Sequence, residues 1–294
     1  MFYRRKMILA LLEVFGGKLM KINLQKVLFL ITQRQTKPAY DFIPFKFGCF
    51  SFSANADLTA MVKHGFLTED EQSFTKKDKQ TYLSTLNDAD RKLVNQVYTL
   101  FRNHDADALM TYTYTQYPYY AINSVKAPQL LNRNQMDKVE TARPSSNKTI
   151  LYTIGYEGIS LEAYLNKLVR NDVKVLVDVR NNPLSQKYGF SKSLLSSCCN
   201  KLGIEYVHFA EVGIQSEDRK ELNEQADYDN LFDSYRSNTL PRTTDTQQKI
   251  LSLLQQKQRI ALTCFEANIC QCHRKHLSEA ITRLPGWHYE LKHI

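Results

Sequence analysis

The residues best suited to chemistry stand near the end of the chain, between an apolar run and the helix expected after it. The run 260–264 is typical of a buried strand, and the spacing of apolar residues predicts a helix over 273–284. A carboxylate, two thiols, an imidazole and a guanidinium lie close together here: Glu266, Cys270, Cys272, His273 and Arg274. Backbone N–H groups at the start of a helix stabilise anions, including thiolates. The group therefore indicates nucleophilic or anion-binding chemistry.

Alternating strands and helices are expected to position this group. From residue 149 onward, apolar runs at 150–154, 174–179, 204–209 and 260–264 predict strands, and helical spacing between them predicts helices. Strands that alternate with helices pair in parallel, because each connection must cross back over the sheet. We therefore expect an α/β domain over 149–294, with a mostly parallel sheet flanked by helices.

Polar residues follow each expected strand at its carboxyl end, where open parallel sheets bind ligands. We expect these loops to meet at one edge of the sheet. The residues expected to bind a substrate or its phosphate are Tyr156, Asp178, Arg180, Asn182 and Arg274. The residues expected to be catalytic are Glu157, Glu266, Cys272 and His273. Arginine suits phosphate through its planar fork of donors, and the carboxylates suit acid–base chemistry.

Structural roles compete with the functional ones at several of these positions. Arg180 can pair with Asp178 as a purely structural bond. Glu157 lies in the sequence Gly-Tyr-Glu-Gly, which is typical of a turn, so it can be a turn residue without a catalytic role. His208, at the end of the third expected strand, is typical of a core histidine. Both interpretations stay open for each of these residues.

The cysteines divide into buried and reactive candidates. Cys264, inside the apolar run, is expected to be buried and less reactive, whereas Cys272 at the helix start is the better nucleophile or redox thiol. Zinc is the competing interpretation, with Cys270, Cys272, His273 and His276 as ligands. Their spacing is not that of a paired CxxC site, so the expectation is no cofactor, with zinc as the alternative.

The positive charge of the N-terminal part of the chain predicts a negatively charged binding partner. Residues 1–150 hold 21 Lys and Arg against 13 Asp and Glu, while residues 151–294 hold 18 against 17, within a chain of net charge +9. Residues 1–125 predict three helices followed by a hairpin, the order of a winged-helix module, with Asn23 as the expected cap of the second helix. Residues 126–148 are a polar linker candidate. We expect DNA or RNA as the partner. The tyrosine-rich stretch 112–120 indicates packing between domains or stacking on bases.

Several classes of protein are disfavoured. The chain holds no apolar run long enough to span a membrane, and its cysteine usage is typical of the cytoplasm, where thiols stay reduced. It lacks the glycine-rich dinucleotide loop and the phosphate-binding GK[ST] loop, so bound nicotinamide, flavin or ATP has no support. The sequence does not indicate an oligomeric state.

Several ordered blocks over about 150–284 resemble the domain of unknown function 488 family. The blocks are Thr153–Gly158, Asp178–Pro183, Gly189–Ser191, and Cys264-x-Glu266 with Cys272-His273-Arg274. The blocks 24–30, 44–48 and 117–124 are similar to the extension of longer members. The resemblance implies an α/β domain with a shared polar site and no settled reaction. The residues it implies for that site are Glu157, Asp178, Arg180, Asn182, Pro183, Glu266, Cys272, His273 and Arg274.

Three functional hypotheses follow. The first is a nucleic-acid-associated protein whose α/β domain carries out hydrolysis or transfer on a nucleotide or nucleic-acid group. The second is a thiol enzyme, redox or sulfur-transferring, centred on Cys272. The Asp-Val-Arg block is similar to that of rhodanese domains, but 270–274 does not reproduce their thiol loop, which disfavours sulfur transfer. The third is a DNA- or RNA-binding regulator without enzymatic activity.

Overall fold

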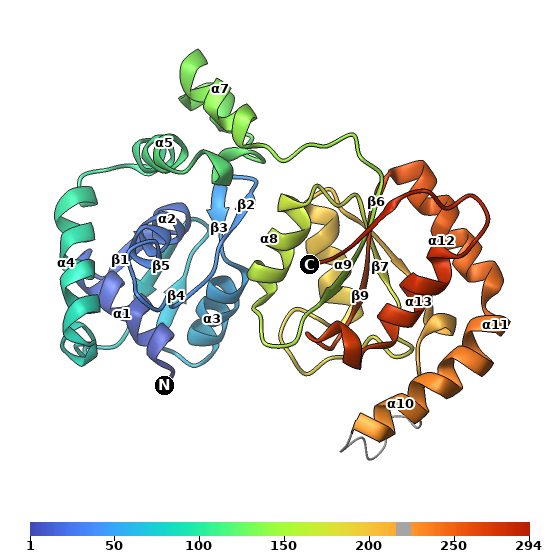
Figure 1. The fold of residues 1–294 in the computed structure, drawn as a ribbon. Coiled ribbons are helices and arrows are strands. Elements are labelled where there is room, and N and C mark those ends of the chain that lie inside the picture. Colours follow the sequence, from blue (N-terminus) through green and yellow to red (C-terminus); the bar gives the residue numbers. More distant parts are fainter. Residues whose placement is uncertain (216–224) are drawn as a thin grey trace. The chain divides into compact units, whose positions relative to one another are not determined.

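The chain forms two units in the computed structural model, which describes residues 1–215 and 225–294 (Figure 1). The N-terminal unit is Met1–Arg143 and the C-terminal unit is Pro144–Ile294. Each unit has its own sheet and its own hydrophobic core. None of the helices in the described ranges combines the length and the hydropathy that crossing a membrane requires.

A five-stranded parallel sheet forms the centre of the C-terminal unit, as the alternation of strands and helices predicts. Its strands are β6 (Ile150–Gly155), β7 (Val175–Asp178), β8 (Glu205–His208), β9 (Arg259–Cys264) and β10 (Glu290–His293). Their order is β10-β6-β9-β7-β8, and every neighbouring pair is parallel. The central strands β6, β7 and β9 are buried throughout, which explains their mainly apolar composition. The α/β class is confirmed.

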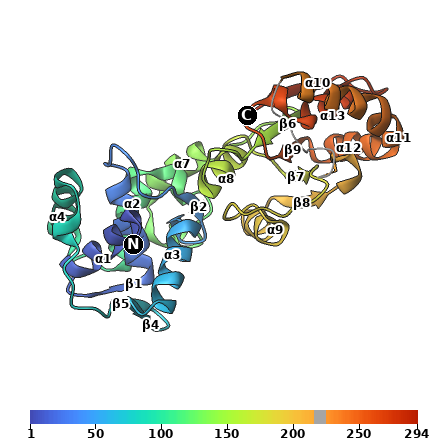
Figure 2. The ribbon, with the colours of Figure 1, turned by 90° about the horizontal axis from the view of Figure 1, so that it is seen from below.

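Helices cover both faces of this sheet. They are α8 (Leu161–Arg170), α9 (Lys192–Lys201), α10 (Gln225–Ser234), α11 (Leu240–Arg242), α12 (Thr244–Lys257) and α13 (His273–Thr282), with a π-helical segment at Tyr235–Thr239. The strands lie between α9 and α12 in both views (Figure 1, Figure 2). Side chains of α12 and α13 pack with Val177, Leu262 and Cys264 on one face. Tyr164 of α8 bonds Thr263 on the other face.

Helices dominate the N-terminal unit. They are α1 (Tyr3–Val14), α2 (Lys21–Thr32), α3 (Phe52–Lys63), α4 (Asp88–Phe101), α5 (Ala106–Gln116), α6 (Ala127–Leu130) and α7 (Arg133–Ala142). Its strands are β1 (Lys18–Met20), β2 (Ile43–Phe45), β3 (Gly48–Phe50), β4 (Leu67–Glu69) and β5 (Ser73–Lys76). The three-stranded sheet has the order β1-β5-β4 and is antiparallel, and β2 with β3 forms a separate hairpin.

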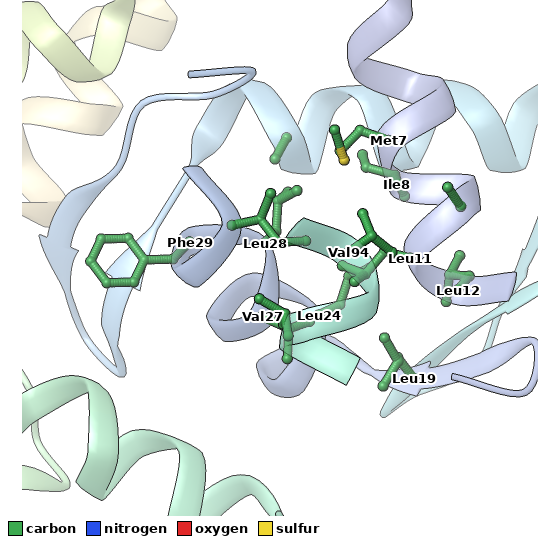
Figure 3. Packing of buried hydrophobic residues seen from close by; sticks show 14 of the residues in the cluster. Met7, Ile8, Leu11, Leu12, Leu19, Leu24, Val27, Leu28, Phe29 and Val94 are labelled. Carbon is green, nitrogen blue, oxygen red and sulfur yellow. The ribbon is translucent and has the colours of Figure 1, made fainter. Parts of the chain in front are cut away.

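The core of the N-terminal unit forms around α2, which is buried along almost its whole length. Leu24, Val27 and Leu28 of α2 lie near the apolar residues of α1 and Val94 of α4 (Figure 3). Phe29 points away from them, and its ring contacts those of Phe42, Tyr117 and Tyr120. The tyrosine-rich stretch thus contributes to packing inside this unit.

Two details differ from the expectations. Asn23 does not cap the second helix, because α2 begins at Lys21 and Asn23 is buried inside it. The expected linker 126–148 contains α6 and α7, and its residues up to Arg143 belong to the N-terminal unit. Polar composition alone does not separate a linker from a short amphipathic helix such as α7, which begins with a complete capping box at Asn132 and Gln135.

Candidate functional site

A cavity of about 240 Å³ opens at the carboxyl edge of the parallel sheet. Its walls come from the segments after β6, β7, β8 and β9, because parallel strands end at the same edge. The residues that line it include Tyr156, Arg180, Asn181, Asn182, Cys264 and Phe265. The convergence expected from the sequence therefore occurs for all four loops, with Ile214 contributed by the segment after β8, and three of the expected site residues line the cavity directly.

A buried ion pair forms one wall of this cavity. The Nε of Arg180 donates to both carboxylate oxygens of Asp178, at 2.9 and 3.1 Å, and Tyr206 donates its hydroxyl to the same carboxylate. The Nη1 of Arg180 donates to the Tyr156 hydroxyl and the Phe190 carbonyl, both at 2.8 Å. Burial disfavours the charged guanidinium, but the carboxylate of Asp178 outweighs this and raises the pKa of Arg180.

Arg180 is therefore committed to partners within its own unit. Each of its three nitrogens donates a hydrogen bond there, and only 5% of the residue is exposed. The Tyr156 ring stacks on that of Phe190, at 4.3 Å between centroids, which fixes the hydroxyl that Arg180 bonds. This geometry agrees with the structural interpretation of Arg180 and Asp178 and leaves little donor capacity for a phosphate.

Arg274 and Glu157 likewise hold the loop after β9. Arg274 lies buried on α13 and donates to the carbonyls of Glu266 and Ala267, at 2.6 and 3.2 Å. The carboxylate of Glu157 accepts from the backbone N–H of Ala267 at 2.9 Å. Gly155 permits the close approach of this loop, because a Cβ there would lie 1.9 Å from the Glu266 carbonyl oxygen. The two side chains thus order the loop that carries Glu266.

A thiol–imidazole pair lies at the end of β9. Nε2 of His273 is 3.0 Å from the Val179 carbonyl, so it carries the proton in the neutral ring, and Nδ1 is the acceptor. Nδ1 lies 3.6 Å from Sγ of Cys264, and a carboxylate oxygen of Glu266 lies 3.3 Å from the same sulfur. Cys264 is fully buried from bulk solvent yet lines the cavity. The arrangement can draw the proton from the Cys264 thiol.

Cys272 is less well placed than the sequence suggests. It stands at the N-cap position of α13 but makes no side-chain capping bond, and it is buried. Burial, with Cys264 and Glu266 nearby, raises the pKa of the Cys272 thiol well above its ordinary value, against the opposing effect of Arg274. The helix N-terminus does not overcome desolvation, so the thiol form of Cys272 is favoured.

A thiophilic metal ion would find three ligands here, but not the four expected. The ligand atoms of Cys264, Cys272 and His273 lie within 4.8 Å of one another. The bond from Nε2 of His273 to a backbone carbonyl is also the usual support of a metal-bound histidine. Cys270 is exposed, and His276 contacts Arg236 and the Phe232 ring, so neither is part of the cluster.

Sequence reasoning missed the roles of Cys264 and Asn181. Cys264 is buried, as expected, but its contacts with His273 and Glu266 were not anticipated. Its position as the last residue of a central parallel strand was the available signal. Asn181 lines the cavity, and its amide donates to the Ala210 carbonyl at 3.2 Å.

The fold and the site define an α/β unit with polar loops gathered at the carboxyl edge of a parallel sheet. Residues 160–281 match the family model described as Domain of unknown function DUF488. This match lies within the C-terminal unit, and the resemblance drawn from the motifs is confirmed over these residues. No curated protein matches the chain.

Proposed function

We propose that the protein binds nucleic acid through its N-terminal unit. The observation that supports this most is the topology of that unit: three helices, with β1 between the first two, precede a β4–β5 hairpin, and the sheet order is β1-β5-β4. This order resembles that of a winged-helix module, apart from the β2–β3 hairpin inserted between α2 and α3. In helix-turn-helix modules the last of these helices enters the major groove.

The surface of α3 suits this role. Asn55, Thr59 and Lys63 are exposed and follow one another at four-residue intervals, so they form one polar stripe along the helix. The hairpin after α3 ends in Glu69, Asp70 and Glu71, so it brings acidic rather than basic residues. Phosphate contacts are therefore expected from α3 and the excess lysines of the unit, and less from the hairpin tip.

Fluorescence anisotropy with labelled duplex DNA, single-stranded DNA and RNA tests this proposal. We expect binding that weakens linearly on a log–log scale as salt rises, because phosphate contacts release counterions. Lys63→Met should reduce the slope of that dependence by about one. Lys249→Met, an exposed lysine on α12 of the C-terminal unit, is the matched control and should leave it unchanged. Absence of binding at low salt to all three probes would refute the proposal.

The cavity of the C-terminal unit favours thiol chemistry as a second function, with Cys264 rather than Cys272 as the nucleophile. His273 accepts the thiol proton at Nδ1, the thiolate attacks an electrophilic carbon of the substrate, and the leaving group departs with the electrons of the broken bond. Arg180 and Arg274 already donate hydrogen bonds to partners within the protein. This favours thiol chemistry over a site in which the two arginines bind a phosphate group.

Alkylation of the folded protein by iodoacetamide, mapped by mass spectrometry, tests the thiol proposal. The exposed Cys270 reacts first, so the measurement uses a Cys270→Ser background. We expect Cys264 to react there before Cys272, forming a carbon–sulfur bond as iodide leaves. His273→Gln should slow the reaction at Cys264 about 10²-fold, because the general base is lost. His288→Gln replaces an exposed histidine of the same unit, so it is the matched control and should leave the Cys264 rate unchanged.

Two outcomes would contradict the thiol proposal. One is labelling of Cys272 before Cys264, and the other is labelling of Cys264 only after denaturation. Zinc held by Cys264, Cys272 and His273 would protect both thiols, and elemental analysis of the purified protein identifies that case. Nucleic-acid binding together with an inert Cys264 would favour the regulator without enzymatic activity.

A further inference from the structure

The N-terminal unit contains a second cavity, of about 340 Å³, which the proposed function does not use. It lies among α2, the β2–β3 hairpin, the first half of α3 and Phe74 of β5. Four phenylalanine rings line it: Phe45, Phe47, Phe50 and Phe74. Phe47 is 37% exposed, and the exposed Lys46 and Asn55 also border the cavity, so it is open to solvent on this side.

A buried lysine is the most unusual part of this cavity. Lys26 of α2 lines it while only 2% exposed, and its Nζ donates to the Cys49 carbonyl at 3.0 Å. Among the described residues Lys26 forms no ion pair, whereas Lys21 at the same cavity pairs with Glu69 at 2.6 Å. Burial lowers the pKa of Lys26, and Cys49 opposes that effect only in part. The charge of Lys26 is therefore left without a carboxylate partner.

The backbone around the cavity is held in place before any ligand arrives. Gln25 and Ser51 exchange two hydrogen bonds, one in each direction between the Gln25 amide and the Ser51 backbone. The Ser51 hydroxyl then caps α3. Gly48 has φ +85°, and a Cβ there would lie 2.3 Å from the Tyr114 ring, so the hairpin packs closely on α5. A preformed pocket binds its ligand without an ordering cost.

We propose that this cavity binds a small aromatic carboxylate, with its ring among the phenylalanines and its carboxylate beside Lys26. The ring suits aromatic walls, which favour offset and edge contacts. The single negative charge neutralises the buried ammonium group of Lys26, which a neutral ligand would leave uncompensated. The volume falls within the range of small-molecule sites. A phosphate-rich polyanion does not suit walls that are mainly aromatic, so this site is distinct from a nucleic-acid surface.

Isothermal titration of the full-length protein with 1-naphthoate and with neutral 1-naphthamide tests the proposal. We expect the carboxylate to bind at least about tenfold more tightly than the amide. Lys26→Met should remove this preference by weakening naphthoate at least about tenfold while leaving naphthamide almost unchanged. Methionine fills a similar volume without a buried charge, so the fold should be retained, and a thermal melt verifies this.

Control variants separate the site from a general charge effect. Lys63→Met removes an exposed lysine of α3 that does not line the cavity and should leave both affinities unchanged. Phe47→Ala should weaken both ligands, because it removes an aromatic wall. Equal affinity of the two ligands, no binding of either, or naphthoate binding unaffected by Lys26→Met would overturn the proposal. No nucleic acid is present in this assay, so its outcome is independent of the proposed function.

Discussion

Replacing Asp178 by asparagine is expected to lower the free energy of unfolding of the C-terminal unit by about 3–5 kcal/mol. Asp178 is fully buried, and it accepts hydrogen bonds from Arg180 and from the Tyr206 hydroxyl. Asparagine has nearly the same shape but no charge, so the guanidinium of Arg180 would stay buried without its counterion. Urea denaturation, followed by circular dichroism, measures the loss.

The pair of Glu205 with Lys257 is the matched control for this prediction. It joins β8 to α12 at 2.7 Å, with side chains that are 49% and 36% exposed. Glu205→Gln should cost less than about 1 kcal/mol, because water compensates an exposed charge. If Asp178→Asn were equally mild, the buried pair would not anchor this edge of the sheet, and Arg180 would be available for a substrate after all.

Gly155→Ala is expected to destabilise the same unit by about 3 kcal/mol, by crowding rather than by loss of charge. The new Cβ would lie 1.9 Å from the carbonyl oxygen of Glu266, the atom to which Arg274 donates. Since this contact involves backbone, no side chain can rotate to relieve it, and the loop that carries Glu266 must move. The same unfolding measurement applies, and the alkylation rate of Cys264 should change with it.

Gly158→Ala distinguishes crowding from backbone strain. Gly158 has φ +75°, a conformation that costs a side chain about 1–2 kcal/mol, but no atom lies within 4 Å of a Cβ built there. A loss at Gly158 that equals the loss at Gly155 would show that the close approach to Glu266 is unimportant. A clearly smaller loss is the expected result.

The secondary structure of the C-terminal unit was largely predictable, for physical reasons. Strands buried on both faces are mainly apolar, and the runs that became β6, β7 and β9 have that composition. Ser160 marks the start of α8, where its hydroxyl accepts from a backbone N–H. The same reasoning was wrong at Asn23, because the tertiary packing that buries α2 determines where that helix begins.

The candidate site was predictable in position but not in its pairings. Parallel strands must end at one edge, so the convergence of their loops followed from the fold class. Whether Arg180 faces a substrate or Asp178 depends on rotamers and burial, which a sequence does not show. Similarly, Cys264 contacts His273 because α13 packs against the face of β9 on which Cys264 lies. The order of strands in the sheet determines which helix packs against that face.

The strand order also has a consequence for how the chain assembles during synthesis. β6 and β7 follow each other in sequence but are not neighbours, because β9 lies between them. Neither strand can complete its pairing until residues beyond Arg259 have left the ribosome. Contacts between such distant segments form slowly during folding. Until β9 pairs with them, the edges of β6 and β7 stay unpaired and exposed. We therefore expect this half to fold more slowly than the helical one.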